Sequence, residues 1–290
     1  MRFLVTGVTG FLGWRAATLL AERGHDVLGL ARPGGAARAH AAGVAAERVD
    51  AGDPAARGLV AGCDVVLHFA GVPDPAGARA DPARAVRENA GTTANLLDGC
   101  LEHGAALIYP STVRAALDPP PDAYGLSKRL GEEACRLHAA RAAVARLTSV
   151  FGPGQVAWEG ATGAIAAFAR RALERQPIVI PGDPQRVRDF VYVDDAVAAL
   201  EAIALQARWG ETLTLAGGSP TSLLRAAELV REAAGGDVPI ETPGGELPPG
   251  EDAGYPAAGD LAGLGATVRP IEDAVREYVE WLRHQPAAPR

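Results

Sequence analysis

A glycine-rich segment near the N-terminus places the strongest limit on how this chain can fold. It reads TGVTGFLG at 6–13 and lies between an apolar run at 3–5 and a segment at 14–23 with helical spacing of apolar residues. Glycines in this spacing permit a tight turn, let backbone amides approach a pyrophosphate at a helix N-terminus, and let the helix pack close to the strand. The segment therefore predicts a strand, a turn and a helix that together bind a dinucleotide.

Alternating strands and helices continue through the first half of the chain. The expected strands are 27–30, 63–69, 105–109 and 143–150, and the helices between them are 54–61, 83–102 and 124–141. Strands that alternate with helices form βαβ units, whose parallel sheet is covered on both faces. We therefore expect an α/β fold with a Rossmann doubly wound parallel sheet.

The pattern loosens after Phe151, where a smaller C-terminal substrate-binding domain is expected. Helices are predicted at 161–175, 194–205, 222–234 and 271–282, strands at 178–180 and 212–215, and a loop or short hairpin at 236–260. The predicted division is a Rossmann dinucleotide-binding domain at 1–150, completed by segments near 190–216, and a mostly substrate-binding domain at 151–290.

Composition and charge exclude several classes of protein. Of 290 residues, 48% are hydrophobic, which is enough to bury one large core or two smaller ones. The net charge of −7 argues against nucleic acid or an anionic membrane as a partner. No apolar run reaches the roughly 18 residues of a membrane span, and the N-terminus lacks a signal-peptide pattern. A cytoplasmic protein is expected.

Cysteines and histidines give no sign of a metal site or a disulfide framework. Cys63, Cys100 and Cys135 are widely spaced and include no Cys-x-x-Cys pair, and the six histidines lack metal-binding spacing. These features predict reduced core thiols and no bound metal.

A second motif supplies acid/base chemistry. Lys128 is the only lysine among 28 basic residues, and it follows Tyr124 by four positions at the start of a predicted helix. That spacing places both side chains on one helix face, where an ammonium would lower the phenol pKa toward neutrality. Such a tyrosine can exchange a proton with a hydroxyl or carbonyl oxygen during hydride transfer. Ser111 and Thr112 follow a predicted strand at the sheet edge where ligands bind.

The end of the second strand bears on the choice of cofactor. Ala31-Arg32 stands where an acidic residue would bind the ribose hydroxyls of NAD, and a guanidinium there would hold a 2′-phosphate instead. NADP(H) is therefore the favoured cofactor, with NAD(H) as the alternative, and Arg38 is a second candidate for the phosphate.

Taken together and in order, these segments resemble the extended short-chain dehydrogenase/reductases of the NAD-dependent epimerase/dehydratase family. The matching segments are TGVTGFLG at 6–13, DAGD at 50–53, HFAG at 68–71, NAGTTANLL at 89–97, PST at 110–112, YGLSK at 124–128, RLTSVFGPG at 146–154 and VRDFVYVDD at 187–195. The resemblance runs through most of the chain and implies a Rossmann cofactor domain with a smaller substrate domain.

Site residues are carried over by position. The resemblance implies that Tyr124 is the acid/base, that Lys128 holds the nicotinamide ribose, and that Thr112 aligns the substrate oxygen. Ser149 and Arg188 are expected at the substrate, with Arg188 on a diphosphate or in an ion pair with Asp189. The residues expected at the cofactor are Gly7, Thr9, Gly10, Phe11, Leu12, Gly13, Arg32, Asp50, Ala51, Phe69, Ala70, Gly71, Asn89, Ser111, Tyr124 and Lys128.

The chain also departs from the sugar-nucleotide members of this family. Ser149 replaces an asparagine, and the segment LPPGE at 247–251 replaces a late loop whose arginine contacts the nucleotide phosphates. Glu246, Glu251 and Asp252 make that loop negative, which would repel a diphosphate unless they point elsewhere. These departures favour an oxidoreductase acting on a carbonyl or secondary alcohol.

Two other functions remain open alongside the oxidoreductase. A sugar-nucleotide epimerase or dehydratase, similar to a UDP-glucose 4-epimerase with tightly bound NAD, is the main alternative, and a silent NADP sensor is the third. The segments at 72–82, 113–123, 155–165 and 240–260 are expected to form the substrate pocket, with Trp158 lining it or covering the core. A homodimer is expected through the helices at 83–102 and 124–141, with Ala134, Ala139 and Ala140 allowing close approach.

Overall fold

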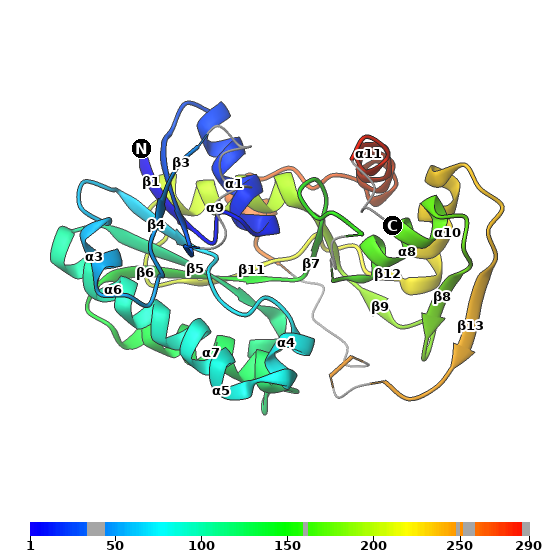
Figure 1. Cartoon of the computed structure of the whole chain (residues 1–290), viewed down its shortest axis with the longest axis horizontal. Helices are drawn as coiled ribbons and strands as arrows, with labels where there is room; N and C mark the ends of the chain where they lie inside the picture. Colours follow the sequence, from blue (N-terminus) through cyan, green and yellow to red (C-terminus); the bar gives the residue numbers. More distant parts are fainter. Residues whose placement is uncertain (34–43, 159–161, 248–249, 252–258, 286–290) are drawn as a thin grey trace.

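A seven-stranded parallel sheet forms the centre of the larger half of the molecule (Figure 1). The computed structural model describes residues 1–33, 44–158, 162–247, 250–251 and 259–285. The strand order is β11-β6-β5-β4-β1-β2-β3, so the direction of strand addition reverses between β1 and β4. The strands are β1 (Arg2–Thr6), β2 (Asp26–Ala31), β3 (Ala45–Arg48), β4 (Val65–His68), β5 (Ala106–Thr112), β6 (Arg141–Leu147) and β11 (Thr212–Leu215). This is the predicted Rossmann fold, and ligands of such sheets bind at the reversal point.

Helices cover both faces of this sheet, as Figure 1 shows. On one face, α1 (Phe11–Glu22) packs beside α9 (Val193–Leu205), and the Arg15 guanidinium donates two hydrogen bonds of 2.7 Å to the Asp194 carboxylate. The opposite face carries α3 (Ala55–Gly58), α6 (Thr92–His103) and α7 (Ala123–Leu137). Since both faces are covered, β4 is buried along its full length and reads as an uninterrupted apolar run before His68.

The smaller half has its own hydrophobic core. Phe151, Tyr192 and Tyr278 pack edge to face at its centre, with ring centroids 5.8 and 5.9 Å apart. Its helices are α8 (Ala164–Leu173), α10 (Leu223–Ala234) and α11 (Ile271–Arg283), and its strand pairs are β7 (Ser149–Phe151) with β10 (Phe190–Tyr192), β9 (Val187–Arg188) with β12 (Thr221–Ser222), and β8 (Ile178–Pro181) with β13 (Ile240–Gly244). This second core begins at Phe151, close to the predicted boundary.

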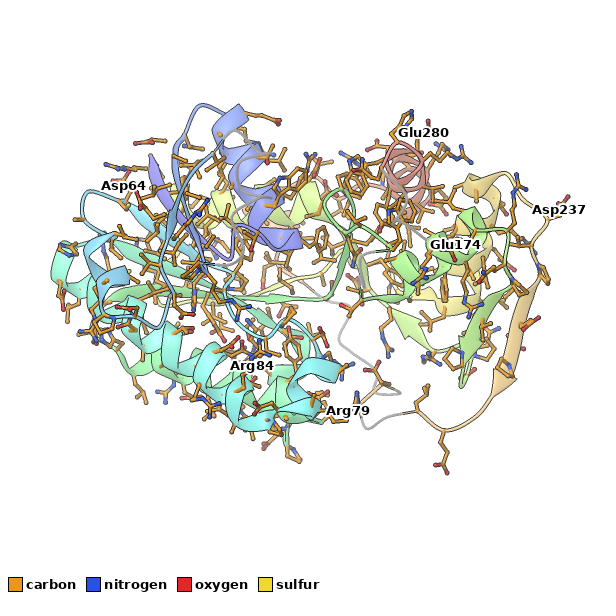
Figure 2. The ribbon with its side chains drawn as sticks, viewed as in Figure 1. Asp64, Arg79, Arg84, Glu174, Asp237 and Glu280 are labelled. Carbon is orange, nitrogen blue, oxygen red and sulfur yellow. The ribbon has the colours of Figure 1, made fainter. Side chains whose placement is uncertain are left out.

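Side chains in Figure 2 show where charge lies on this framework. Asp64 and Arg84 lie at the outside of the larger half, and Glu174, Asp237 and Glu280 at the outside of the smaller one. These charged groups thus face solvent, while apolar groups fill the cores, as hydrophobic burial requires.

Three predicted elements differ from the structure. The helix expected at 83–102 consists of α5 (Pro82–Val86), a π-helical turn (Arg87–Gly91) and α6. The strand expected at 143–150 is interrupted at Thr148, whose hydroxyl donates to the Asp189 carboxylate and the Leu215 carbonyl. The residues beyond it leave the main sheet as β7. In the segment 236–260, where a loop or short hairpin is expected, the described residues contain β13, which pairs in parallel with β8.

The cysteines occupy one core, on the α6 and α7 side of the sheet. Cys63, Cys100 and Cys135 are free and buried, and burial raises the pKa of both Cys100 and Cys135 to about 12. They are therefore protonated, unreactive thiols at neutral pH. Within the described residues, no helix is both long and apolar enough to cross a bilayer, and no group of three or more potential metal-binding side chains gathers.

Candidate functional site

A cleft of about 770 Å³ opens at the carboxyl ends of the parallel strands and extends to the smaller half. One wall comes from the loops after β1, β2, β4 and β5 together with α7, and the other from β7, β9 and the start of α8. The predicted site residues that line it are Gly7, Thr9, Gly10, Phe11, Leu12, Gly13, Arg32, Asp50, Ala51, Phe69, Ala70, Gly71, Ser111, Thr112, Tyr124, Lys128, Ser149 and Arg188. Asn89 is the predicted residue outside this lining, and Arg38 lies outside the described residues.

The glycine turn has no room for side chains. Gly7 has φ of +66°, and a Cβ there would lie 2.8 Å from the Ala70 backbone nitrogen. A Cβ on Gly13 would overlap the Gly7 carbonyl, so α1 could not begin so close to β1. The turn leaves backbone amides facing the cleft at the start of α1, which is the arrangement that binds a pyrophosphate.

A buried histidine ties the two strands that flank this turn. The Thr6 hydroxyl lies 2.8 Å from His68 Nδ1, accepts a 3.0 Å hydrogen bond from the Ala70 amide, and so links β1 to the end of β4. The other ring nitrogen lies 3.1 Å from the Thr92 hydroxyl. Burial, with a smaller effect from the nearby Lys128 ammonium, lowers the pKa of His68 to about 3. The imidazole is therefore neutral and acts as a structural connector.

Asn89 supports the cleft wall from behind. Its side-chain oxygen accepts a 2.9 Å hydrogen bond from the Val72 amide, and its Nδ2 donates to the Ser127 hydroxyl at 2.9 Å. A Cβ on Gly71 would overlap the side-chain oxygen of Asn89. Asn89 is fully buried, both its polar atoms are engaged, and it does not line the cleft, so its place at the cofactor stays a prediction. Asn89 joins the loop after β4 to α7.

The far end of the cleft contains Arg32, Asp50 and Ala51. Arg32 is 60% exposed and its guanidinium lies 3.6 Å from the Glu88 carboxylate, which also lines the cleft. Asp50 Oδ1 accepts a 2.8 Å hydrogen bond from the Gly52 amide and so fixes the turn after β3. Among the described residues, Glu88 also accepts a 2.7 Å hydrogen bond from Arg84, so the carboxylate beside Arg32 is shared between two arginines.

Thr112, Tyr124 and Lys128 come together where β5 ends and α7 begins. Asp122 caps α7 by accepting a 2.7 Å hydrogen bond from the Gly125 amide, which fixes Tyr124 in the first turn. Lys128 is buried, and its Nζ donates a 2.9 Å hydrogen bond to the Pro110 carbonyl. Burial lowers the pKa of Lys128 to about 8, partly offset by the Glu132 carboxylate.

The expected lowering of the Tyr124 pKa by Lys128 is wrong for this structure. Burial raises the pKa of Tyr124, and the Asp74 and Asp122 carboxylates raise it further. The cation that opposes this rise is the Arg114 guanidinium. Helical spacing therefore aligned the tyrosine and the lysine, but their tertiary surroundings decide which charge acts on the phenol.

The Ser111 hydroxyl is held by a carboxylate of α7. It donates a 2.5 Å hydrogen bond to Glu132, which also accepts three hydrogen bonds from Arg146, the shortest of 2.6 Å. The Thr112 hydroxyl accepts from the Arg114 amide at 3.3 Å and remains on the cleft side. Of the two hydroxyls, that of Ser111 is engaged by a carboxylate, whereas that of Thr112 accepts from a backbone amide.

Comparisons with known proteins now bear directly on this cleft. Residues 3–215 match the model of the NAD dependent epimerase/dehydratase family. The chain belongs to this family. A dTDP-glucose 4,6-dehydratase of Streptomyces griseus is 29% identical over 81% of this chain and 79% of its own length. Two solved structures are also similar along nearly the whole chain.

The first similar structure is the UDP-glucose 4-epimerase of Thermotoga maritima with UDP-glucose, at 25% identity and a TM-score of 0.85, covering 98% of this chain and 99% of that one. The second is the UDP-glucuronic acid 4-epimerase of Bacillus cereus in complex with UDP-glucuronic acid and NAD. It has 22% identity and a TM-score of 0.84, with the same coverage. The fold of the epimerase/dehydratase family therefore extends through both halves of this molecule.

Sequence patterns missed several residues on the substrate side of this family member's cleft. Gln155, Arg186, Phe190 and Glu251 line it together with Ser149 and Arg188. Gln155 and Glu251 fall in segments expected to form the pocket, and Phe190 lies in the matched segment 187–195, but the sequence singles out only Glu251, by its charge. Trp158 packs against the second core, which agrees with the core-covering alternative. Asp189 binds the Gly217 and Gly218 amides at 2.6 and 2.8 Å, so its carboxylate anchors the loop after β11.

Arg114 is the least expected of the cleft residues. It lies in a 3₁₀ turn (Val113–Ala116) directly after Thr112 and is only 9% exposed. Its guanidinium lies 2.5 Å from the Asp122 carboxylate and 3.3 Å from that of Glu251. The Glu251 backbone carbonyl accepts a hydrogen bond from Arg188. The late loop of this family member therefore turns its carboxylate toward Arg114, not toward Arg188.

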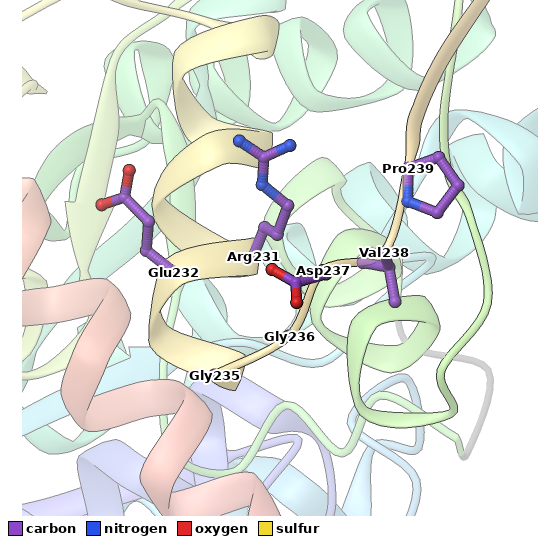
Figure 3. Close-up of a pocket in the computed structure, with 7 residues that line it drawn as sticks. All are labelled: Arg231, Glu232, Gly235, Gly236, Asp237, Val238 and Pro239. Carbon is purple, nitrogen blue, oxygen red and sulfur yellow. The ribbon is translucent and has the colours of Figure 1, made fainter.

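A second hollow lies at the outer end of the smaller half, where α10 ends (Figure 3). Arg231 and Glu232 from the last turn of α10 and the loop 235–239 form it. Its lining includes none of the predicted site residues, and it lies away from the glycine turn and Tyr124. The chemistry is therefore assigned to the larger cleft.

Proposed function

We propose that this chain is an NAD-dependent sugar-nucleotide epimerase or dehydratase. The observation that carries the proposal is one cleft that contains the glycine turn, the Thr112–Tyr124–Lys128 set, and two arginines, Arg186 and Arg188, on the opposite wall. An enzyme that oxidises a sugar while holding its nucleotide needs all three features in one cavity. The relatives named above act on UDP- or dTDP-sugars, which supports the same class here.

The residues at the turn fit a dinucleotide, because Gly7 and Gly13 pack so tightly against backbone that neither has room for a Cβ, and the turn they form lines the cleft at the start of α1. When bound, the nicotinamide accepts a hydride from the sugar and later returns it. The turn amides would hold the pyrophosphate, and Lys128, already fixed on the Pro110 carbonyl, would donate to the nicotinamide ribose.

Tyr124 would move the proton. Its phenolate oxygen removes a proton from the sugar hydroxyl as that carbon loses hydride, and its phenol returns the proton on reduction. The Thr112 hydroxyl, beside Tyr124 in the cleft, would donate a hydrogen bond to the same sugar oxygen. Because burial raises the pKa of Tyr124, the cations near it must stabilise the phenolate.

NAD suits the adenosine end of the cleft better than NADP. Glu88 lies 3.6 Å from Arg32, so a 2′-phosphate held by Arg32 would also meet a carboxylate. The Bacillus cereus structure contains NAD, in keeping with this choice. The sequence favoured NADP(H) on the basis of Arg32, with Arg38 as a second candidate that lies outside the described residues; the proposal made here takes NAD(H) instead.

Arg186 and Arg188 would hold the diphosphate of the substrate. Both line the wall formed by the smaller half, where guanidinium groups can bind phosphate oxygens in pairs. The acidic late loop does not oppose this at Glu251, whose carboxylate lies on Arg114. Asp252 falls outside the described residues.

A carbonyl reductase that exchanges its cofactor is the second candidate. Arg32 favours it, since it stands at the end of β2 in place of an acid and is 60% exposed. It shares Tyr124, Lys128 and Thr112 with the leading proposal. The two candidates differ in whether the nucleotide remains bound between turnovers.

The test begins by denaturing purified protein and identifying the released nucleotide by mass spectrometry. Near-stoichiometric NAD or NADH, together with conversion of UDP-glucose or dTDP-glucose, supports the proposal. Tyr124→Phe should keep the nucleotide and lose about 10²-fold or more of the turnover. Protein that releases NADP(H), or none, and converts only simple ketones or aldehydes would overturn the proposal in favour of the reductase.

We also propose that the chain forms a homodimer through α7. Leu126, Leu130 and Leu137 are 47%, 41% and 72% exposed and lie on one face of this helix. Exposed leucines in such a row mark a contact surface. Ala140, by contrast, is buried and Ala134 packs against the core. Leucines, rather than the alanines expected from the sequence, would make the contact.

A further inference from the structure

A guanidinium beside the reacting end of the cleft points to the chemistry of the substrate. Arg114 follows Thr112 by two residues, lines the same cavity as Tyr124, and is the cation that acts on the Tyr124 phenol. Its position differs from that of Arg186 and Arg188, which come from the smaller half. Arg114 therefore lies at the sugar end of the cleft, not at the diphosphate end.

The two carboxylates that pair with Arg114, those of Asp122 and Glu251, differ in how firmly they are held. Asp122 uses its other oxygen to cap α7 at Gly125, so its position is fixed by the helix that carries Tyr124. Glu251 belongs to the late loop, its side chain is 36% exposed, and its carboxylate lies 3.3 Å away. Because the Arg114–Glu251 pair is longer and more exposed, breaking it would cost less free energy than breaking the Arg114–Asp122 pair. Glu251 is therefore the carboxylate that a ligand can replace.

Backbone geometry brings the loop to this position. Gly250 has φ of +79°, and a Cβ there would lie 2.8 Å from Pro121 and 2.9 Å from the Arg114 guanidinium. The chain thus approaches Arg114 more closely than a residue with a side chain would permit. The carboxylate of Glu251 reaches the cleft because of this close approach.

We propose that Arg114 binds a carboxylate carried by the reacting sugar, and that Glu251 stands in for that carboxylate here. The proposal rests on the proposed function and deepens it, because it assigns the substrate to the acidic sugar nucleotides. A carboxylate on a carbon next to the reacting alcohol would meet the guanidinium while the alcohol meets Thr112 and Tyr124. A planar guanidinium matches such a group with two parallel hydrogen bonds.

The test compares three ligands by calorimetry on NAD-loaded protein in a Tyr124→Phe background, which prevents conversion. UDP reports the nucleotide contacts, and UDP-glucose and UDP-glucuronic acid differ only in the carboxylate. We expect UDP-glucuronic acid to bind about tenfold or more tightly than UDP-glucose, as a charge-assisted hydrogen bond implies. Arg114→Gln should bring that ratio close to one and leave UDP binding unchanged.

Glu251→Gln should change the affinity for UDP-glucuronic acid in the direction opposite to Arg114→Gln. If Glu251 competes with the substrate carboxylate, this variant should bind UDP-glucuronic acid more tightly and UDP-glucose as before. If the Glu251–Arg114 pair merely holds the loop, both sugars should bind more weakly, and the proposal fails. Should Arg114→Gln not fold, as judged by near-ultraviolet circular dichroism, Glu251→Gln decides alone, and unchanged affinities also overturn the proposal.

Arg129→Gln is the matched control. Arg129 is the next arginine along the chain, pairs with Asp118 at 3.1 Å, and does not line the cleft. It should leave all three affinities unchanged. If the protein that keeps Arg114 binds UDP-glucose and UDP-glucuronic acid equally well, Arg114 does not bind the carboxylate. The same follows if the preference for UDP-glucuronic acid persists in Arg114→Gln. Either result contradicts the carboxylate proposal and leaves the sugar-nucleotide function standing. Failure of UDP itself to bind contradicts the sugar-nucleotide function and the carboxylate proposal together.

Discussion

Lys128 is the only lysine among 28 basic residues, and the fold surrounds it almost completely with protein. Its Nζ has one fixed partner, the Pro110 carbonyl, and lies 4.7 Å from the centre of the Tyr109 ring. An ammonium in such surroundings loses much of its hydration, which is why burial lowers the pKa of Lys128 to about 8. Keeping this ammonium charged in the folded protein is therefore costly to stability.

Lys128→Met should therefore stabilise the protein in a pH-dependent way. The ammonium has a pKa of about 8 in the fold and 10.5 when unfolded, so between these values the unfolded chain binds more protons and wild-type stability rises with pH. The variant lacks this gain. Its stability relative to wild type should fall by ~2 kcal/mol from about pH 7 to about pH 9.5, measured by urea unfolding.

Arg129→Met is the control for this experiment, because it removes an exposed cation from the same helix. It should show no comparable pH-dependent difference from wild type. A constant difference between Lys128→Met and wild type at both pH values would mean that the fold does not lower the pKa of the lysine.

At the scale of elements, the glycine turn joins β1 to α1 through contacts that only backbone can make. The Gly10 amide donates to the Gly7 carbonyl at 2.9 Å, and Gly13 packs directly against the same carbonyl group. The turn also touches the end of β4 at Ala70. Its shape is therefore set jointly by two strands and one helix.

Gly13→Ala should disrupt the close packing of α1 against the turn after β1. The added Cβ would overlap the Gly7 carbonyl, so α1 must move away from β1 and the pyrophosphate loses its amides. We expect a destabilisation of about 1–3 kcal/mol and a loss of bound nucleotide, followed by thermal unfolding and by the nucleotide content of purified protein.

Gly91→Ala is the matched control for this change. Gly91 lies at the start of α6, is exposed, and has no atom within 4 Å of the position of a Cβ. Alanine should stabilise the helix there by about 0.5–1 kcal/mol and leave nucleotide content unchanged. If both variants kept their nucleotide, close packing at Gly13 would not matter for binding.

At the scale of the whole molecule, one cleft between two cores brings the cofactor wall and the substrate wall together. The helix that carries Tyr124 and Lys128 on its inner side carries the exposed leucines on its outer side. If two copies pair through α7, the dimer contact lies directly behind the proposed catalytic residues. Assembly and site geometry then depend on the same helix.

Leu130→Glu combined with Leu137→Glu should convert the proposed dimer to a monomer. Charged groups at these positions would have to be buried in the contact, which is costly without partners. Light scattering after gel filtration should change from twice 29.8 kDa to 29.8 kDa. Leu205→Glu on α9, 59% exposed, is the control and should leave the mass unchanged. A monomeric wild type would refute the contact.

The sequence determined those features whose geometry is local. Glycine spacing specified the turn between β1 and α1, because the backbone itself makes the contacts, and i, i+4 spacing aligned Tyr124 with Lys128 on one helix face. Strand and helix periodicity gave the Rossmann sheet, although the break at Thr148 depends on Asp189 and Leu215, which come from distant segments.

Tertiary structure decided which charges face one another. Arg114 and Glu251 meet because the late loop crosses to the head of α7, and no spacing in the sequence brings those two positions together. The same holds for Glu88 beside Arg32 and for the burial that sets the pKa of Tyr124 and Lys128. Ion pairs and desolvation depend on neighbours in space, whereas the sequence by itself specifies only neighbours along the chain.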